Sequence, residues 1–497
     1  MDKKILITIS GVVIIGIVAL SAFVFFQPQG SAQEEIKVNI LTRNSSSLFT
    51  TFEAEFLKSS FAPKGYNIDL IFKTQDQGLW KTTIDQGDIY VAWGGGPALF
   101  DSLIKDNYLK PFTNQSILDE ISYLRANEWT NDQIAGSPMF RNGTGDGANS
   151  IYWAGYAISS FGFTINNVTL ASRNVPAPST WDGIAHPKYY FDTPLVSVGS
   201  AAGSTSNTRV YEIVVQKFGW NLGWGILSLI GGNAKIEEGS VQTLTDVEVG
   251  DVGIANTIDF YGFDSQIQYP DTKYILPVNQ SIVNCDPIAF TKNTNPDPKK
   301  QMVAEAFVQF MLSKYGQAVL LNQNIKRMPI RIDAFDSTPS DPAYDDAPLL
   351  KDLYISTKSN IGIDFNDTLS LSYLSSLIYY WEATINGAHN ELRDLMKSVK
   401  AAYTGGKITA TQYLKLALAI GAPVGSPAFD VNYAISINDV MEKDEATRTS
   451  YMNAWQTAAQ SKYTSLKGMV DSITPSTDFG ISDAAIQNIV NPWQSSF

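Results

Sequence analysis

The chain has 497 residues and a formal net charge of −13, and 12% of its residues are aromatic. This length has room for two or three domains, and the acidity argues against nucleic acid or an anionic membrane surface as a partner. The single cysteine, Cys285, excludes an intramolecular disulfide, and two histidines leave almost no candidates for a His-rich metal site or a Ser-His-Asp triad. We therefore predict that the protein is not an enzyme and holds no metal and no cofactor.

The first predicted element is a membrane-spanning helix. Residues Ile5–Phe26 contain no charged side chain and follow Lys3 and Lys4. Such a helix would be about 33 Å long, enough to cross the apolar core of a bilayer, and the lysine pair should stay in the cytoplasm. The alternative is a cleaved secretory signal, for which Gly30-Ser31-Ala32 provides a small-residue cleavage site. Residues 1–34 are thus a membrane anchor or a signal segment, and the body is either extracellular on a single-pass anchor or secreted.

Strand and helix patterns alternate from residue 36 onward. Leu48, Phe52 and Phe56 recur at helical spacing, and a stronger helix is predicted over residues 302–321. Strands are predicted at residues 36–41, with mixed polarity, and at residues 66–72, 88–93, 157–165, 190–192, 252–255 and 287–290. This order is typical of a parallel sheet with helices on its faces.

The pattern changes after a Pro- and Asp-rich linker at Asp336–Asp346. Beyond it, Leu392, Leu395, Val399 and Tyr403 follow one helical stripe, and residues 350–475 are predicted to be mostly helical. The carboxylates of the linker could hold Ca²⁺, but an acidic, solvated linker is the simpler interpretation.

Four polar or glycine-rich loops lie at predicted strand ends. They are Ser45-Ser46-Ser47, Gly94-Gly95-Gly96-Pro97, Ser204-Thr205-Ser206-Asn207 and Asn256-Thr257. Open α/β sheets bind ligands at this edge, where glycines let a ligand approach the backbone and Trp93 would supply an apolar wall. Hydroxyl and N–H groups at a helix start suit an oxyanion or a hydroxyl group. The alternative interpretation is a plain strand–helix turn or N-cap at each loop.

Other motifs have simpler interpretations. Residues 143–147 (Gly-Thr-Gly-Asp-Gly) lack the preceding strand and following helix of a phosphate-binding loop, and are predicted to form a surface loop. His186 and His389 are predicted at a loop and near a helix start. Six sequons permit N-glycosylation, at Asn44, Asn114, Asn142, Asn167, Asn279 and Asn366.

The order of six segments between about Ile36 and Ile330 carries a family resemblance. The segments are residues 88–97, residues 157–163 followed by Asn166, residues 178–183, residues 200–207, residues 251–255 followed by Tyr261, and residues 307–317. Together they resemble the extracellular solute-binding proteins of ABC transporters, within the branch that includes iron-, thiamine- and polyamine-binding proteins. The chain departs from that branch in its long helical segment after Asp346 and in lacking a clear tyrosine cluster for iron. Tyr152, Tyr156 and Tyr261 are the tyrosines left near a cleft.

The resemblance implies a type II periplasmic-binding-protein-like α/β fold with two lobes around a cleft, preceded by the transmembrane helix and followed by a C-terminal helical extension. The chain would cross between the lobes near Ile151–Gly162 and Asp259–Tyr269. The implied division is residues 1–34 (anchor or signal), 35–150 (lobe 1, first part), 151–264 (lobe 2), 265–345 (return to lobe 1) and 346–497 (helical extension).

The resemblance also implies a function. The protein would be a membrane-anchored receptor that captures a small molecule or an ion and delivers it to the permease subunits of an ABC importer. Ligand contacts are predicted from Ser45, Ser46, Trp93, Gly95, Ser204, Thr205, Asn207, Asn256 and Tyr261. The hydroxyl-rich helix starts suit an oxyanion, whereas the net acidity and Asp259 suit a cation. The alternative functions are a cell-surface sensory or structural protein that keeps the fold, and an exported hydrolase with paired carboxylates.

Overall fold

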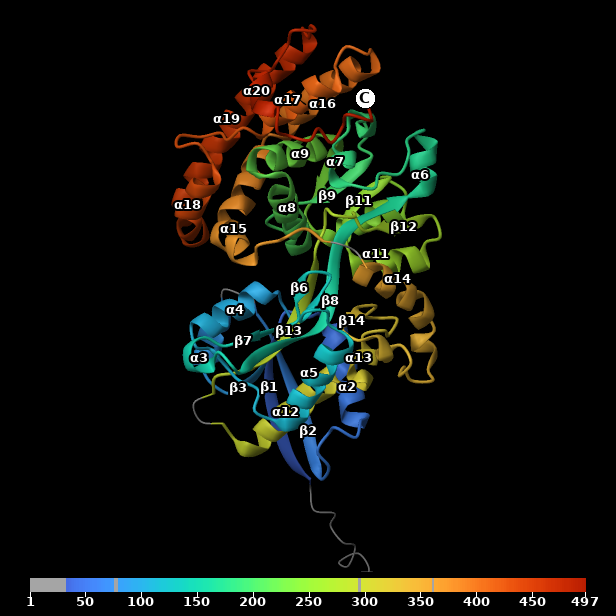
Figure 1. The fold of residues 1–497 in the computed structure, drawn as a ribbon, viewed down its shortest axis with the longest axis vertical. Helices are drawn as coiled ribbons and strands as arrows, with labels where there is room; N and C mark the ends of the chain where they lie inside the picture. The colour runs from blue at the N-terminus through green and yellow to red at the C-terminus, as the bar shows by residue number, and fades with distance from the viewer. Residues whose placement is uncertain (1–32, 76–78, 294–295, 360–361) are drawn as a thin grey trace, which may run out of the picture.

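The computed structural model describes residues 33–75, 79–293, 296–359 and 362–497. The predicted membrane-spanning or signal helix lies outside these residues. Within the described ranges, no helix combines the length and apolarity that crossing a membrane requires. The chain forms two α/β lobes stacked along the long axis, with the C-terminus on the lobe opposite to the one that contains β1 (Figure 1). The predicted mixed α/β fold is confirmed.

The first lobe is built on a sheet with parallel strands at its centre. β1 (Glu34–Thr42) pairs in parallel with β2 (Tyr66–Thr74) and β3 (Ile89–Trp93), and β13 (Val283–Thr291) runs antiparallel to β3. Every residue of β3 is buried, as is typical when elements cover both faces of a sheet. The shorter strands of this lobe are β4 (Leu109–Lys110), β5 (Gln133–Ile134), β6 (Ser137–Pro138), β7 (Phe140–Asn142) and β14 (Met328–Pro329). Its helices are α2 (Ser46–Lys58), α3 (Trp80–Asp85), α4 (Pro97–Lys105), α5 (Gln115–Asn127), η2 (Gly145–Gly147), α12 (Pro298–Leu312), α13 (Lys314–Val319), η4 (Ile332–Ala334), η5 (Pro342–Tyr344) and α14 (Ala347–Ser359).

The second lobe is built on a smaller sheet in the order β10-β9-β11-β8, with β12 also paired to β8. Its strands are β8 (Ile151–Asn166), β9 (Val196–Gly199), β10 (Ala234–Glu237), β11 (Ile254–Ile258) and β12 (Thr272–Ile275). Its helices are α6 (Asn167–Ser172), α7 (Trp181–Ile184), η3 (Pro187–Tyr189), α8 (Thr205–Phe218), α9 (Trp220–Asn233), α10 (Ser240–Glu248) and α11 (Asp259–Gln268). The strand predicted at residues 190–192 is absent, because the rings of Tyr190 and Phe191 pack under Arg393 and Lys400 of a C-terminal helix instead.

Long strands connect the lobes. Residues 153–160 of β8 pair with β13 in the first sheet, and residues 161–166 pair with β11 and β12 in the second. The chain returns through residues 276–283 rather than through Asp259–Tyr269 as predicted, because residues 259–268 form α11 and pack on β12. It passes to the second lobe again between α14 and the next helix, where the N–H of Ile363 donates to the carbonyl of Ser281 (2.9 Å).

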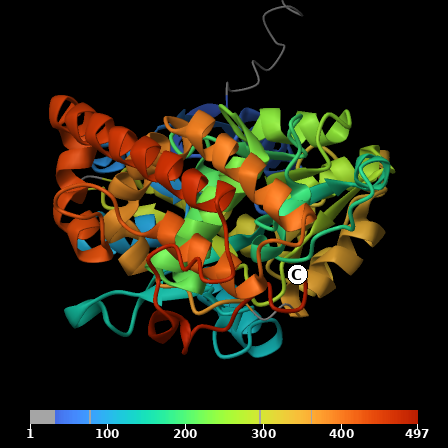
Figure 2. The ribbon, with the colours of Figure 1, turned by 90° about the horizontal axis from the view of Figure 1, so that it is seen from above.

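The C-terminal helices share one hydrophobic core with the second lobe. They are α15 (Asp367–Trp381), the π-helical turn η6 (Glu382–Asn386), α16 (His389–Thr404), α17 (Ala410–Gly421), α18 (Val431–Lys443), α19 (Glu445–Asp471) and α20 (Asp483–Ile486). One continuous cluster of buried side chains contains Trp224 of α9 together with Tyr380 and Trp455 of these helices. Figure 2 shows the C-terminal helices lying across the outer face of the second lobe. The predicted predominance of helix after residue 350 is confirmed.

Helices α9 and α17 approach each other backbone to backbone. A Cβ added at Gly225 would lie 2.1 Å from the carbonyl oxygen of Ala417, and one at Gly421 would lie 1.9 Å from that of Asn221. Glycine at these positions therefore sets the distance between the two helices. Helix α14 does not join the C-terminal helices, although it lies within the helical extension predicted from residue 346. Its Leu350 and Tyr354 pack in the core of the first lobe instead.

Candidate functional site

Two adjoining cavities lie between the lobes. Their volumes are about 210 Å³ and about 650 Å³. Both are lined by Arg43 and Arg327 from the first lobe and by Thr205, Ser206 and Ile258 from the second. We call the two cavities together the cleft.

Polar turns at the ends of β1 and β3 form the first-lobe wall. The hydroxyl of Thr42 donates to the carbonyl of Trp93 (2.8 Å) and accepts from the N–H of Asn44 (3.0 Å). These bonds hold the two strand ends together, so that Arg43 and Asn44 line the smaller cavity. Asn44 is 5% exposed, and its Nδ2 has no hydrogen-bond partner among the described residues. A buried amide donor at a cavity wall is satisfied when a ligand or water oxygen accepts from it.

The turn from β3 to α4 requires glycine. Gly94 and Gly95 have φ values of +82° and +103°, which L side chains rarely adopt. A Cβ at Gly94 would lie 2.7 Å from Nδ2 of Asn44. The backbone of Gly95 and Gly96 can therefore lie along the wall of the smaller cavity.

Two helix starts form the second-lobe wall. Ser204 caps α8, because its Oγ accepts from the N–H of Asn207 (3.1 Å) and from Nδ2 of the same residue (2.9 Å). Oδ1 of Asn207 in turn accepts from the N–H of Gly199 (3.0 Å). The next residues, Thr205 and Ser206, line both cavities, and Oγ of Ser206 lies 2.7 Å from Oγ of Ser240 at the start of α10.

Cationic side chains reach the cleft from both lobes. Arg327 forms an ion pair with Asp286 of the first lobe, and its guanidinium lies 4.8 Å from the ring centroid of Phe260 on α11. Lys326 pairs with Asp264 of α11, so adjacent first-lobe residues both contact the second lobe. Burial raises the pKa of the Asp286 carboxyl, although Arg327 and Arg43 oppose this effect.

Arg209 is the cation contributed by the second lobe. It lines the smaller cavity, and its Nη1 lies 3.3 Å from Glu212 and 3.4 Å from Asp367. Asp259 does not line either cavity. Burial raises the pKa of Asp259 to about 7, while hydrogen bonds from the N–H groups of Ser160 and Phe260 act in the opposite direction.

The structure brings four of the predicted contact residues together. Ser45, Gly95, Thr205 and Tyr261 line one or both cavities. Ser46 is exposed in the first turn of α2 and is not among the lining residues.

The other predicted contacts lie behind the walls. Trp93 is fully buried, with its ring 5.5 Å from that of Phe52 and 5.6 Å from that of Tyr156, so its ring belongs to the core rather than to the cavity wall. The side chains of Ser204 and Asn207 hydrogen-bond to each other and to the backbone near the start of α8. Asn256 is 1% exposed in β11, and its Oδ1 has no partner in the part of the chain that the structure describes.

The charged residues that line the cleft are not among the predicted contacts. Arg43 lies two positions after the strand predicted at residues 36–41, and Arg209 lies two positions after the Ser204–Asn207 loop, so both could have been found by their place in the chain. Arg327 lies after a helix with no local motif, and only the return of the chain to the first sheet brings it to the cleft.

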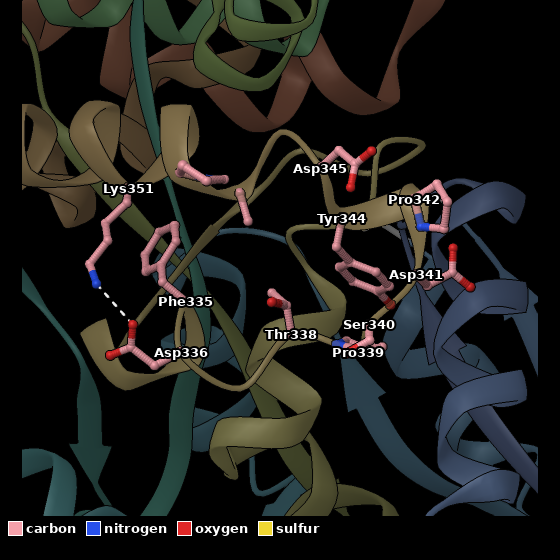
Figure 3. A pocket seen from close by; sticks show the side chains of 12 residues that line it. Phe335, Asp336, Thr338, Pro339, Ser340, Asp341, Pro342, Tyr344, Asp345 and Lys351 are labelled. Carbon is pink, nitrogen blue, oxygen red and sulfur yellow. Dashed lines mark hydrogen bonds and ion pairs between the residues drawn. The ribbon is translucent and has the colours of Figure 1, made fainter.

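The Asp-rich linker forms a separate hollow of about 620 Å³ on the first lobe (Figure 3). Asp336 pairs with Lys351 (3.0 Å), and Asp341 accepts from the N–H of Ala343 (2.9 Å). Figure 3 shows the carboxylates of Asp336, Asp341 and Asp345 pointing away from one another. Across the described residues, no group of three or more His, Cys, Asp or Glu side chains could hold a metal ion. The carboxylates of the linker are thus not gathered into one group.

Both histidines connect the second lobe to the C-terminal helices. Nε2 of His186 lies 3.1 Å from the carbonyl of Ser496, and its ring packs on those of Tyr403 and Phe497. Burial, together with Lys188, lowers the pKa of His186 to about 4. Nε2 of His389 lies 3.0 Å from the carbonyl of Gly231. Neither histidine lines the cleft.

Comparison with known proteins identifies the family. Residues 95–357, just over half of the chain, match the family model described as bacterial extracellular solute-binding protein. The chain belongs to this family. The resemblance to extracellular solute-binding proteins is thereby confirmed.

A curated relative covers a smaller part of the chain. The phosphoglycerate transport regulatory protein PgtC of Salmonella typhimurium is 29% identical over 176 residues, which are 35% of this chain and 42% of PgtC. The match thus spans less than half the length of the curated relative.

Solved structures of solute-binding proteins are similar at low sequence identity. The fructose-6-phosphate-bound protein AfuA of Actinobacillus pleuropneumoniae is 15% identical with a TM-score of 0.48, and the match covers 70% of this chain and 98% of AfuA. The spermidine/putrescine ABC transporter substrate-binding protein PotD of Streptococcus pneumoniae is 16% identical with a TM-score of 0.49, and the match covers 70% of this chain and 98% of PotD. Iron-bound HitA of Pseudomonas aeruginosa is 13% identical with a TM-score of 0.45, and the match covers 65% of this chain and 98% of HitA.

Proposed function

We propose that this protein captures a small solute bearing at least one oxyanion group and delivers it to the permease of an ABC importer. The observation that carries the proposal is the convergence of Arg43, Arg209 and Arg327 on one cavity of about 210 Å³. These guanidinium groups gather in one place although the chain as a whole has a net charge of −13, and two of them, Arg209 and Arg327, also pair with carboxylates. Charge–charge attraction is stronger beside a protein surface than in bulk water.

Groups on both walls fit an oxyanion. Guanidinium groups can donate two hydrogen bonds to a phosphate or carboxylate, and the start of α8 adds the hydroxyls of Thr205 and Ser206 with the positive end of the helix dipole. On the first-lobe wall, Nδ2 of Asn44 lacks a partner in the described structure. A solute oxygen in the smaller cavity would satisfy this donor.

A cationic solute fits the cleft less well. The carboxylates that line it are those of Asp286 and Asp264, and each forms an ion pair, with Arg327 and Lys326 respectively. The carboxylate of Asp259, which would suit a cation, accepts hydrogen bonds inside the second lobe instead. The larger cavity carries hydroxyl and amide groups such as those of Ser45, Tyr261 and Gln268, which suit a hydroxylated body of the solute.

The curated relative supports the same ligand class. Phosphoglycerate, which appears in the name of PgtC, carries a phosphate and a carboxylate. The similarity covers 35% of this chain, so we take it as support for an oxyanion and not for one particular solute.

The arrangement of the lobes supports closure about a hinge. We propose a first lobe of residues 34–158 and 284–359 and a second lobe of residues 159–275 and 363–497, with β8 and residues 276–283 as connections. A solute that contacts both walls favours the closed arrangement. We also propose that residues 1–34, through the uncharged Ile5–Phe26, hold this body outside the cell on the membrane that contains the permease.

Calorimetry with a panel of solutes tests the proposed function. We expect 3-phosphoglycerate, fructose 6-phosphate or inorganic phosphate to bind with a Kd of about 1 μM or lower, and more weakly as salt is added. Glycerol and fructose, which lack the phosphate group, are matched controls and should give no binding. Binding of spermidine or ferric ion, with none of the three anions binding, would contradict an oxyanion site.

A further inference from the structure

Helix α15 of the C-terminal extension reaches the cleft residue Arg209. Nη1 of Arg209 lies 3.4 Å from Oδ1 of Asp367 and 3.2 Å from Oγ of Ser370. The guanidinium also lies over the ring of Phe365, 5.0 Å from its centroid. Arg209 itself is on α8 and lines the smaller cavity. The C-terminal extension therefore provides part of the environment of a cleft cation.

Further contacts attach α15 to α8. Glu212 of α8 pairs with Nη1 of Arg209 (3.3 Å) and accepts a hydrogen bond from the hydroxyl of Ser370. Gln216 exchanges two hydrogen bonds with the backbone of Asn366, at 2.8 Å and 3.1 Å. The side chains of Arg209, Glu212 and Asp367 are 16%, 3% and 20% exposed. This ionic cluster is largely shielded from water, so its geometry is restrained.

Helix α15 also lies against α4 of the first lobe. α4 begins directly after Gly96, which lines the smaller cavity. Nη2 of Arg209 lies 3.8 Å from the position that a Cβ would take at Gly96. One guanidinium nitrogen is thus held by acceptors of the second lobe and α15, and the other is directed to the first-lobe wall. Because the guanidinium is planar, fixing one nitrogen and one face fixes the directions of the remaining N–H groups.

We propose that Asp367 and Ser370 are positioning residues of the solute site, which hold Arg209 in the orientation in which it donates to the solute. The inference rests on the proposed oxyanion site. It assigns a part in solute binding to a helix that lies beyond the matched residues 95–357. A side chain held in its binding orientation before the solute arrives loses less conformational freedom on binding, and this favours affinity.

A double-mutant cycle tests this inference. The variants are Asp367→Ala, Arg209→Met and the double change, and Asp439→Ala on the exposed face of α18 is the matched control. Affinity for 3-phosphoglycerate, fructose 6-phosphate and inorganic phosphate is measured by calorimetry, and folding is checked by thermal melting.

We expect Asp367→Ala to weaken binding about fivefold to tenfold when Arg209 is present. The same change should have no effect on affinity when it is added to Arg209→Met, because residues that act through one another are not additive. Asp367→Asn keeps an acceptor oxygen and should restore part of the affinity, and Asp439→Ala should leave it unchanged.

Other results would overturn the inference. Equal losses from Asp367→Ala with and without Arg209 would show that Asp367 acts through the fold. Unchanged or tighter binding by Asp367→Ala would show that Glu212 alone suffices to hold Arg209. Full affinity of Arg209→Met would remove Arg209 from the site, and the inference with it, but would leave the proposed function intact. Absence of binding of all three anions by the unaltered protein would contradict the proposed function as well as the inference.

Discussion

Replacing Gly421 with valine is expected to lower the free energy of unfolding by about 3 kcal/mol or more. The reason is steric, because even a Cβ at this position would lie 1.9 Å from the carbonyl oxygen of Asn221 and 2.5 Å from the N–H nitrogen of Gly225. Helix α17 would have to move away from α9, and the buried faces of both helices would lose contacts. Chemical denaturation followed by circular dichroism measures the change.

Gly468→Ala is the matched control for this prediction. Gly468 lies in α19, and a Cβ added there meets no atom within 4 Å. Alanine is a better helix residue than glycine, so this variant should be as stable as the unaltered protein or up to about 1 kcal/mol more stable. If Gly421→Val melted like the unaltered protein, the C-terminal helices could not form one core with the second lobe as described.

Replacing Arg327 with alanine is expected to weaken binding of an anionic solute about 100-fold or more. The change removes a guanidinium from the cavity and leaves the buried carboxyl of Asp286 without its ion-pair partner. Truncating one member of a buried charge pair typically costs about 2–5 kcal/mol, and about 1.4 kcal/mol corresponds to one decade in Kd. Calorimetry with the phosphorylated solutes measures the loss.

Two further variants separate the causes. Arg327→Ala combined with Asp286→Asn removes the unpaired carboxylate, and we expect it to bind the anion more tightly than Arg327→Ala alone. Arg125→Ala breaks a surface pair with Asp132 (2.8 Å) and should leave the affinity unchanged. Full affinity of Arg327→Ala would mean that the solute does not occupy the cavity where the arginines converge.

Local patterns in the sequence predict the longer strands of the first lobe, β1, β2, β3 and β13, but not its strands of two or three residues. β3 is a short apolar run, and in β1 and β2 apolar residues recur between polar ones, so hydrophobic burial on a sheet is enough to define them. The loop at Gly94-Gly95 was predictable for a similar reason, because glycines directly after a buried strand indicate a turn that other residues cannot form.

Tertiary packing explains why some predicted ligand contacts do not line the cleft. Trp93 ends a strand at the ligand-binding edge, but the rings of Phe52 and Tyr156 enclose it, and no local pattern shows which side chains fill that space. Ser204 and Asn207 are polar and near the cleft, yet their oxygens are already used to close the α8 turn.

Long-range contacts could not be predicted from the sequence at all. Arg209 and Asp367 are separated by 158 residues, and only the packing of α15 on α8 brings them together. The helical pattern after residue 350 predicts amphipathic helices, but it does not indicate that their apolar faces complete the core of the second lobe.

Mass spectrometry of the solute retained by the protein tests the proposed oxyanion site without any prior choice of ligand. The protein is purified without denaturation, the bound solute is released by unfolding, and Arg327→Ala is treated in the same way. We expect a small acid with a phosphate or carboxylate group on the unaltered protein and none on the variant. Release of a polyamine or a metal ion, in equal amounts from both proteins, would contradict an anionic solute held by the cleft arginines.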